Sequence, residues 1–436
     1  MKEFLRSLLL VVVIIVALAI WIMLPWYGVV TAAIALALWL LLSRRGHQTT
    51  SVTGVGLATL SSRWGASSVI VVGIAGVVGV LVALLAMGEG FQATLQGTGS
   101  DDTVIVMRAG AQAELNSVLD HDTTVLISQA AGVAKDAQGH PLSSPELVVI
   151  ASLPKKSNGL DANVEIRGVD QQAWAIRPNV KLIAGRRFTP GLRELDVGKG
   201  AMQQFKGVDI GSTINLNNQT WTVVGEFDSG DATDSEMWGD ADVVASTYRR
   251  GSSRTSITAR LAGASALDKF KAALGTDPRL KVDVKTTRAY YTDQSAGLAK
   301  LIRILGTTIA VIMAIGAIFG ALNTMFAAVA TRSREIATLR ALGFRGLPVV
   351  VAVMLETMLL ALAGGVLGAL LAWLIFNHYT VSTLSANFSQ VVFQFKVSPA
   401  LLWSGLKWAL AIGFVGGLFP AVRAARLPVA TALREL

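Results

Sequence analysis

Long apolar runs alternate with polar segments along the chain, and six of these runs are close to the length that crosses a lipid bilayer. A helix needs about 20 apolar residues to span the hydrocarbon core. The runs cover residues 4–24, 29–42, 69–87, 305–330, 349–376 and 400–419. The pattern predicts a polytopic α-helical membrane protein with six spans, in which the first two form an N-terminal hairpin.

The segment between the third and fourth runs, residues 91–296, has a different pattern. Short stretches of alternating or β-branched apolar residues predict strands at 103–107, 147–150, 164–167, 220–224 and 281–285. The first and last of these are expected to pair with each other. Residues 198–205 and 267–274 predict short helices, and Asn217-Asn218 predicts a hairpin turn. This segment is therefore expected to be a large α+β extracytoplasmic domain.

These patterns divide the chain into four parts. Residues 1–45 form the transmembrane hairpin, and residues 46–90 contain an interfacial segment and the third span, which Gly88-Glu89-Gly90 is expected to close. Residues 91–288 form the α+β domain. Residues 289–436 contain a helical stalk, the last three spans and a tail.

The N-terminal part has two interpretations. The apolar residues continue well beyond Ala17-Leu18-Ala19, which favours a permanent hairpin. The same three residues resemble a signal-peptide cleavage site, which leaves a secretory signal as the alternative. Residues 51–64 are mildly polar, and a surface helix at the membrane interface or a plain linker both fit them.

Composition agrees with a membrane protein, since 52% of the 436 residues are hydrophobic and 15% are charged. The net charge of +9 is unevenly distributed. Residues 87–296 carry 22 Lys and Arg against 25 Asp and Glu, and the remaining residues carry 16 basic and 4 acidic side chains. The basic excess therefore flanks the spans, and it does not form the basic-aromatic stripe of a nucleic-acid groove. The chain has no cysteine, which excludes disulfides and thiolate metal sites.

Basic residues predict the topology. Positively charged residues near span ends favour the cytoplasmic side. With both termini inside, the cytoplasmic segments hold twelve basic residues and the short outer loops, 25–28 and 378–399, hold only Lys396. The twelve are Lys2, Arg6, Arg44, Arg45, Arg63, Arg332, Arg334, Arg340, Arg345, Arg423, Arg426 and Arg434.

A short charged segment, TRSREIATLRALGFRG at 331–346, lies between two apolar runs. Residues 333–342 predict a helix, and Gly343 stands where a left-handed cap is expected. Ile336, Leu339 and Gly343 fall on one face at helical spacing. Such a helix serves either as a docking element for a partner or as a basic loop that sets topology.

Several stretches resemble MacB/FtsX-type ABC transporter permeases. The segment 323–343, NTMFAAVATRSREIATLRALG, resembles the permease signature. Residues 56–90, 354–373 and 420–436 resemble the interfacial helix with first span, the third span and the C-terminal tail of that family. Within the α+β domain, IRGVD (166–170), GRRF (185–188) and TWTVVGEF (220–227) resemble the MacB-like periplasmic core. The resemblance covers about residues 52–436, and the first 42 residues are an addition to the family's four spans.

The resemblance implies a non-catalytic permease subunit in a bacterial inner membrane. It implies an ABC nucleotide-binding subunit as partner, which holds the ATP and Mg²⁺, because this chain has no G-x-x-x-x-G-K-[ST] motif and binds no cofactor itself. It also implies a second permease copy or paralogue, a periplasmic adaptor, and contacts with membrane lipids. The task is mechanical transmission for export or extraction of a substrate. The alternative within the family is a signalling subunit that activates a periplasmic enzyme such as a cell-wall hydrolase.

The resemblance assigns the docking (coupling) helix to nine residues of the charged loop: Arg332, Arg334, Glu335, Ile336, Leu339, Arg340, Ala341, Leu342 and Gly343. Its apolar face is expected to enter a groove of the ATPase. The tail residues Arg423, Arg426 and Arg434 are expected to add a second contact.

Among the polar residues within predicted spans, Asn323 and Glu356 are singled out as candidates, and Glu356 is the only carboxylate well inside a span. Glu356 is costly to bury as a charge, so it is expected to pair with a basic loop residue such as Arg340 or Arg345, or to carry a proton-coupling role. The four histidines lack metal-ligand spacing, and the acidic run 226–242 is interpreted as a solvated loop, so no metal site is expected.

Overall fold

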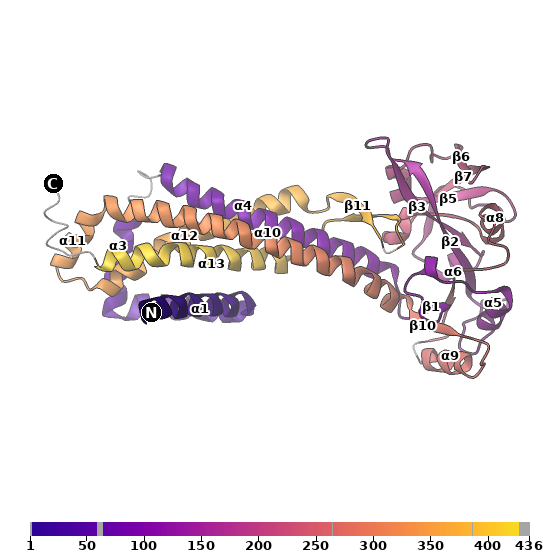
Figure 1. Cartoon of the computed structure of the whole chain (residues 1–436), viewed down its shortest axis with the longest axis horizontal. Helices are drawn as coiled ribbons and strands as arrows, with labels where there is room; N and C mark the ends of the chain where they lie inside the picture. Colours follow the sequence, from indigo (N-terminus) through magenta and orange to yellow (C-terminus); the bar gives the residue numbers. More distant parts are fainter. Residues whose placement is uncertain (1, 59–63, 264, 386, 427–436) are drawn as a thin grey trace. The chain divides into compact units, whose positions relative to one another are not determined.

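The computed structural model describes residues 2–58, 64–263, 265–385 and 387–426. The chain divides into two compact units (Figure 1). The helical unit contains residues up to 87, 302–378 and 396 onwards, and the α/β unit contains residues 88–301 and 379–395. Each unit therefore combines segments that are far apart in the sequence.

The helical unit is built around the long apolar helices α4 (Trp64–Thr98), α10 (Thr287–Thr331), α12 (Gly346–Phe376) and α13 (Pro399–Arg426). Among the described residues, these four are long and apolar enough to span a membrane. The N-terminal helices α1 (Lys2–Met23) and α2 (Trp26–Leu42) are bent by 115° at the break between them, and the described part of this pair is apolar enough to form one broken span. The six-span count and the N-terminal hairpin therefore stay predictions.

Glycine allows the spanning helices to pack closely. A Cβ atom added at Gly368 would lie 2.4 Å from the carbonyl oxygen of Ala75 on α4, and one at Gly365 would lie 2.6 Å from the Cβ atom of Ala409 on α13. Gly416 of α13 similarly meets Ala321 of α10. The glycines of α12 therefore let α4 and α13 approach this helix closely. Gly73 and Gly76 of α4 have open space around them in the described chain.

The N-terminal helices attach to this bundle in two places. Helix α3 (Arg44–Ala58) packs against α12 and α2. Residues 51–58 of the segment 51–64 are therefore helical, and residues 59–63 lie outside the described residues. Lys407 of α13 donates hydrogen bonds from Nζ to the carbonyl oxygens of Ile22 (2.6 Å) and Leu24 (3.1 Å). Trp21 Nε1 donates to the carbonyl oxygen of Lys407 (3.0 Å). A cation thus satisfies carbonyl groups at the C-terminal end of α1, where the helix dipole is negative.

Helix α4 continues well past Gly88-Glu89-Gly90, so these residues do not end the helix, and the end of the third span at this point stays a prediction. Phe91 is 1% exposed and Leu95 is 5% exposed, and both lie in the part of α4 that belongs to the α/β unit. Burial of these side chains outweighs the cost of about 1 kcal/mol that a glycine adds to a helix.

The α/β unit is organised on one mixed sheet. Its strands are β1 (Thr103–Arg108), β2 (Ser143–Pro154), β3 (Asp161–Val169), β4 (Lys181–Gly185), β5 (Glu194–Gly198), β6 (Thr213–Leu216), β7 (Gln219–Asp228), β8 (Glu236–Asp240), β9 (Ser256–Arg260) and β10 (Val282–Thr286). Their order is β10-β1-β9-β2-β3-β8-β5-β7-β4, and β6 pairs with β7. The expected pairing of β1 with β10 is confirmed as antiparallel.

The predicted strands and short helices of this unit are confirmed. The helices are α5 (His121–Ser128), α6 (Ala173–Ile176), α7 (Lys199–Gln204), α8 (Ala241–Thr247) and α9 (Ala266–Gly275), with 3₁₀ turns η2 (Glu114–Asn116) and η3 (Ala232–Ser235). Asn217 and Asn218 have φ angles of 47° and 63°, as a tight hairpin turn between β6 and β7 requires. One apolar core lies under α7 and α8 and contains Trp221, and a second lies under α5 and α9 and contains Phe270.

A two-stranded hairpin, β11 (Thr380–Leu384) and β12 (Gln390–Gln394), was not predicted. It lies in the connection between α12 and α13, which the sequence suggested only as a short outer loop. By its contacts the hairpin belongs to the α/β unit. Its Phe393 is 2% exposed and packs edge-to-face on Phe91, with ring centroids 5.4 Å apart.

Candidate functional site

The charged loop of the helical unit folds as predicted. Helix α11 covers Ser333–Ala341, and Gly343 follows with a φ angle of +98°, the left-handed conformation expected of a C-terminal cap. Glu335 lies in the first turn and Arg340 in the last turn. Both charges complement the helix dipole, so the short helix is stabilised by its own sequence.

The buried face of α11 differs from the expectation that its apolar residues face a partner. Ile336 is 5% exposed and Ala337 is 1% exposed, so both pack inside the helical unit itself. Leu339 is half-buried, and Leu342 is 74% exposed. The surface that α11 offers to another protein is therefore made of Arg334, Glu335, Thr338, Ala341 and Leu342, which we call the α11 outer face.

Arg332, the residue before α11, fixes the loop to a spanning helix. Its Nη1 atom lies 3.0 Å from Oε2 of Glu356 on α12, and its Nε atom lies 3.2 Å from Oε2 of Glu335. The side chains of Arg332 and Glu356 are 14% and 6% exposed. The expectation that Glu356 pairs with a basic loop residue is correct in kind, and the loop residue is Arg332, which the prediction did not name for that role.

Helix α3 covers this ion pair. A Cβ atom added at Gly56 would lie 3.1 Å from Oε2 of Glu356 and 3.2 Å from Nη2 of Arg332. A side chain at this point would require the two charged groups to shift by a few tenths of an ångström. The ion pair is therefore enclosed by three elements, namely α3, the start of α11, and α12.

The other sequence-predicted residues lie apart from this pair. Asn323 is exposed on α10, although an apolar span surrounds it. The guanidinium group of Arg423 on α13 lies 5.6 Å from the centroid of the Phe326 ring on α10. Arg426 is exposed at the end of α13, and Arg434 lies outside the described residues.

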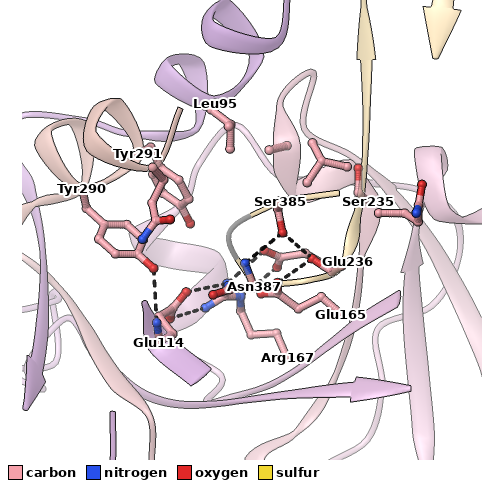
Figure 2. Close-up of a pocket in the computed structure, with 15 residues that line it drawn as sticks. Leu95, Glu114, Glu165, Arg167, Ser235, Glu236, Tyr290, Tyr291, Ser385 and Asn387 are labelled. Atoms are coloured by element: carbon pink, nitrogen blue, oxygen red, sulfur yellow. Dashed lines mark hydrogen bonds and ion pairs between the residues drawn. The ribbon is translucent and has the colours of Figure 1, made fainter. Parts of the chain in front are cut away.

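The α/β unit holds a second polar constellation, centred on Arg167 of β3 (Figure 2). Its Nη1 atom lies 2.8 Å from Glu114 and 2.9 Å from Glu146, its Nη2 atom 2.7 Å from Glu165, and its Nε atom 2.8 Å from Glu236. A second guanidinium group, that of Arg177, lies 2.7 Å from Glu146. We call these six residues the Arg167 cluster. Arg167 and the four glutamates are each less than 9% exposed.

The environment moves the pKa values in this cluster in opposite directions. Burial alone would raise the pKa of Glu146, but the charges of Arg177 and Arg167 outweigh it and lower that pKa. Burial, together with the negative charges of Glu236 and Glu114, raises the pKa of Glu165 to about 7. The positive charge of Arg167 lowers this pKa, but its effect is smaller than that of burial. One carboxyl of the cluster therefore holds its proton near neutral pH.

Sequence reasoning missed this cluster. Arg167 appeared only as a letter of the IRGVD stretch, and its partners come from η2, β2, β3 and β8. The available signal was a pair of charges, Glu165 and Arg167, that alternate with the apolar, β-branched Val164 and Ile166 in a predicted strand. Charged residues of this kind are rarely fully buried unless they are paired.

Two family models match the chain in sequence order. The MacB-like periplasmic core domain matches residues 67–276, and the FtsX-like permease C-terminal domain matches residues 307–429. The curated relatives include proteins described as "Macrolide export ATP-binding/permease protein MacB". The one from Campylobacter jejuni is 34% identical over 132 residues, which cover 30% of this chain and 20% of the relative.

Longer matches have lower identity. The Photorhabdus laumondii MacB protein is 30% identical over 236 residues, 52% of this chain and 35% of the relative. The Nitrobacter winogradskyi MacB protein is 27% identical over 396 residues, 84% of this chain and 56% of the relative. The chain thus spans from a fifth to a little over half the length of these relatives. The crystallised periplasmic region of MacB from Actinobacillus actinomycetemcomitans aligns at 15% identity and a TM-score of 0.32, covering 45% of this chain and 92% of that one.

The four apolar helices and the two matched domains define a permease of the ABC transporter class, a multi-pass inner-membrane protein with a periplasmic domain. Within that class, the chain belongs to the MacB/FtsX-type permeases.

Proposed function

We propose that this chain is the membrane subunit that couples ATP hydrolysis in a separate nucleotide-binding subunit to motion of its own periplasmic domain. That motion drives export or extraction of a substrate. The observation that carries the proposal is the Arg332–Glu356 ion pair, because it fastens the α11 loop rigidly to α12. A loop fastened in this way transmits a push from a docked protein into a spanning helix.

The α11 outer face has the chemistry of a small docking surface. It combines the basic Arg334 and acidic Glu335 with Leu342, whose side chain is 74% exposed. An exposed leucine with neighbouring charges fits an apolar groove with a polar rim on the partner. The relatives are described as ATP-binding/permease proteins, and the 436 residues of this chain contain no phosphate-cradling loop. The ATP and Mg²⁺ site therefore comes from outside these residues.

Two continuous helices provide the mechanical path. Helices α4 and α10 each contain residues of the helical unit and residues of the α/β unit. A displacement at one end of a continuous helix is carried along its hydrogen-bonded axis. With both termini on the cytoplasmic side, as the basic residues predict, α11 lies on the ATP side and the α/β unit on the periplasmic side.

A second copy of the chain or a paralogue is proposed to pack on the exposed side of the bundle. Val69, Val72, Gly73 and Gly76 are exposed on α4. Asn323 is exposed within an apolar span of α10, where a polar side chain is expected to bond to a neighbouring helix. Membrane lipids and a periplasmic adaptor complete the set of expected partners.

The test is co-purification of the full chain from its host membrane, followed by identification of bound proteins and an ATPase assay. Leu342→Asp removes the exposed apolar contact of α11 and is expected to release the ATP-binding protein. Val118→Asp is the matched control, because Val118 is 57% exposed and lies in the α/β unit. Ile336 is unsuitable as a test position, because its burial makes Ile336→Asp a folding mutation.

Retention of the ATP-binding protein by the Leu342→Asp variant at the wild-type level would contradict docking through α11. If the Val118→Asp variant also loses the ATP-binding protein, the cause is a general defect of assembly. If the co-purifying periplasmic protein proves to be an enzyme whose activity follows ATP turnover, the signalling alternative replaces export.

A further inference from the structure

The β11–β12 hairpin is held against the α/β unit by polar contacts along its length. The backbone N–H of Val392 donates to Oγ of Ser235 (2.8 Å), and Gln204 Nε2 donates to Oγ of Ser382 (2.7 Å). Asn163 Nδ2 donates to the carbonyl oxygen of Phe388 (2.9 Å). Because these contacts come from β3, α7 and η3, the hairpin is a docked element rather than a free loop.

Near the turn of the hairpin, Glu165 of the Arg167 cluster joins the docking contacts. Its Oε2 atom accepts hydrogen bonds from Asn387 Nδ2 and from Ser389 Oγ, each at 3.2 Å. Its Oε1 atom accepts from Arg167 Nη2 at 2.7 Å. Figure 2 shows Asn387 and Ser385 of the hairpin beside Glu165, Glu236 and Arg167. A single carboxyl group thus connects the hairpin to the buried charges of the sheet.

The charges of the cluster do not balance. Four carboxyl groups share two guanidinium groups, and burying an uncompensated charge is costly. Titratable and charged groups reach this region from every element around Glu165: Arg167 on β3, Glu146 and Lys155 at β2, Glu236 on β8, Glu114 on η2, Arg177 after α6, and Tyr290 and Tyr291 on α10. A proton on Glu165 reduces the imbalance.

We propose that the β11–β12 hairpin is a proton-linked latch, in which undocking of the hairpin is coupled to loss of a proton from Glu165. Undocking removes Asn387 and Ser389 from Glu165 and opens its carboxyl group to water. Water then solvates the excess negative charge of the cluster. The docked hairpin prevents this solvation.

The direction of the pH effect follows from linkage. With the hairpin docked, burial raises the pKa of Glu165 to about 7 from its ordinary value of 4.5. Exposure to water moves that pKa back toward the ordinary value. Because the undocked form binds fewer protons between these two values, undocking becomes easier as the pH rises from about 4.5 to 7. The hairpin therefore stays docked in mild acid and undocks more readily as the pH rises through neutrality.

The structure leaves room for water to carry the proton. A cavity of about 40 Å³ lies beside Glu165 and is lined by Tyr291, Gln294 and Ser385. This volume holds at least one water molecule. A second cavity of about 230 Å³ is lined by Arg167, Arg177 and Tyr291. The cluster therefore has space for water on more than one side.

The hairpin's place in the chain gives the latch a consequence. Residues 377–379 join it to α12, and residues 395–398 join it to α13. Undocking therefore frees the connection between two spanning helices from the α/β unit. The proposal depends only on the docked hairpin and on the charges of the Arg167 cluster, so it stands or fails independently of any ATPase partner.

The test is thiol labelling of the full chain in lipid nanodiscs. The chain has no native cysteine, so a single introduced cysteine reports one site. Val391→Cys places the thiol on β12 at a position that is 6% exposed, where a maleimide probe reacts only when the hairpin lifts. Ser252→Cys, at an exposed loop position, is the reference that corrects for the pH dependence of thiol chemistry. The ratio of the two labelling rates is expected to rise by up to about tenfold between pH 6 and pH 8.

Three further variants decide the cause. Glu165→Gln keeps the shape and removes the titration, so its labelling ratio is expected to stay low and constant with pH. Asp234→Asn and Asp196→Asn remove the other carboxyl groups whose pKa burial raises, to about 6 and about 7, and the rise is expected to remain in both. Ser389→Ala removes a hairpin donor to Glu165 and leaves all six residues of the Arg167 cluster in place, and it is expected to raise labelling at pH 6.

A pH-dependent ratio that persists in Glu165→Gln overturns the proposal, and so does a ratio that is flat in the wild-type chain. If the labelling ratio no longer rises with pH in Asp234→Asn alone, the proton belongs to Asp234, and the proposal for Glu165 is overturned as well. If Glu165→Gln does not fold, unchanged labelling of the Ser389→Ala variant at pH 6 is the contradicting outcome.

Discussion

Arg332 and Glu356 are bound to each other at 3.0 Å inside the helical unit, one at the start of α11 and the other within α12. The pair joins the segment that contains α11 to a spanning helix. Gly56 of α3 covers it at close range. The charge within the membrane-spanning segment therefore has a structural partner, Arg332.

Removing one partner of this pair is expected to destabilise the helical unit. A buried charge left without its partner costs about 3–5 kcal/mol, whereas replacing both partners by apolar residues costs much less. Arg332→Met and Glu356→Met should therefore each lower the thermal stability of the purified protein more than the double variant does. Differential scanning fluorimetry in detergent measures this. A double variant whose loss equals the sum of the two single losses would contradict the pairing.

Lys407 is expected to hold the N-terminal helix α1 on α13. Lys407→Met keeps the length of the side chain and removes the hydrogen bonds to the carbonyl oxygens of Ile22 and Leu24. Hydrogen bonds from charged groups contribute about 1.5–3 kcal/mol, so α1 should become more mobile. Faster hydrogen–deuterium exchange in residues 16–24, with α12 unchanged, is the expected result. Lys396→Met is the control, since Lys396 is exposed and lies before α13.

Arg167 is expected to be essential for the α/β unit. Arg167→Met leaves the carboxyl groups around it without their main counter-charge, at a cost of about 3–5 kcal/mol. The loss should be largest at pH 8 and smaller at pH 6, because protonation of Glu165, whose pKa burial raises to about 7, reduces the negative charge left without a partner. Hydrogen–deuterium exchange of β3 and β8 in the full chain measures it. Equal exchange in the variant at both pH values, after correction for intrinsic rates, would count against an electrostatic role.

Asp196 of β5 is expected to make the α/β unit less stable in alkali. Burial raises its pKa to about 7, from an ordinary value of 3.8. Its Oδ2 atom accepts from the backbone N–H of Phe188 (3.1 Å), and its Oδ1 atom has no hydrogen-bond partner among the described residues. The folded state holds a proton that the unfolded state releases, so the contribution of Asp196 is lost as the pH rises from about 4 to 7.

The variant Asp196→Asn removes this dependence. Its melting temperature is expected to equal or exceed that of the wild-type chain at pH 8 and to change less between pH 6 and pH 8. The exposed Asp209→Asn serves as the control. A larger loss of stability for Asp196→Asn at pH 8 than at pH 6 would reverse the sign and reject the buried, protonated state.

Local features were predictable because their causes are local. The φ angles of Asn217 and Asn218 and the cap at Gly343 follow from the preferences of those residues for left-handed backbone. The pairing of β1 with β10 was also expected, from two strands that frame the α+β segment. In the helical unit, the long apolar runs and the short charged helix α11 came directly from hydrophobic length and period.

Features that depend on distant residues were not predictable. The burial of Ile336 inside its own unit reverses the face of α11 that a partner can reach, and no helical period tells which apolar surface is already covered. The extension of α4 through Gly88 and Gly90 depends on where Phe91 is buried.

By itself, the sequence determined the class of this protein: spans, a large inserted α+β domain, a short charged helix and the motifs of a permease family. Each of these depends on hydrophobic period, turn chemistry or short motifs, which act over a few residues. Tertiary structure alone decided that Arg332 meets Glu356, that Arg167 gathers glutamates from η2, β2, β3 and β8, and that the β11–β12 hairpin reaches Glu165. Buried charges find their partners through the packing of the whole chain, because only there does desolvation make pairing necessary.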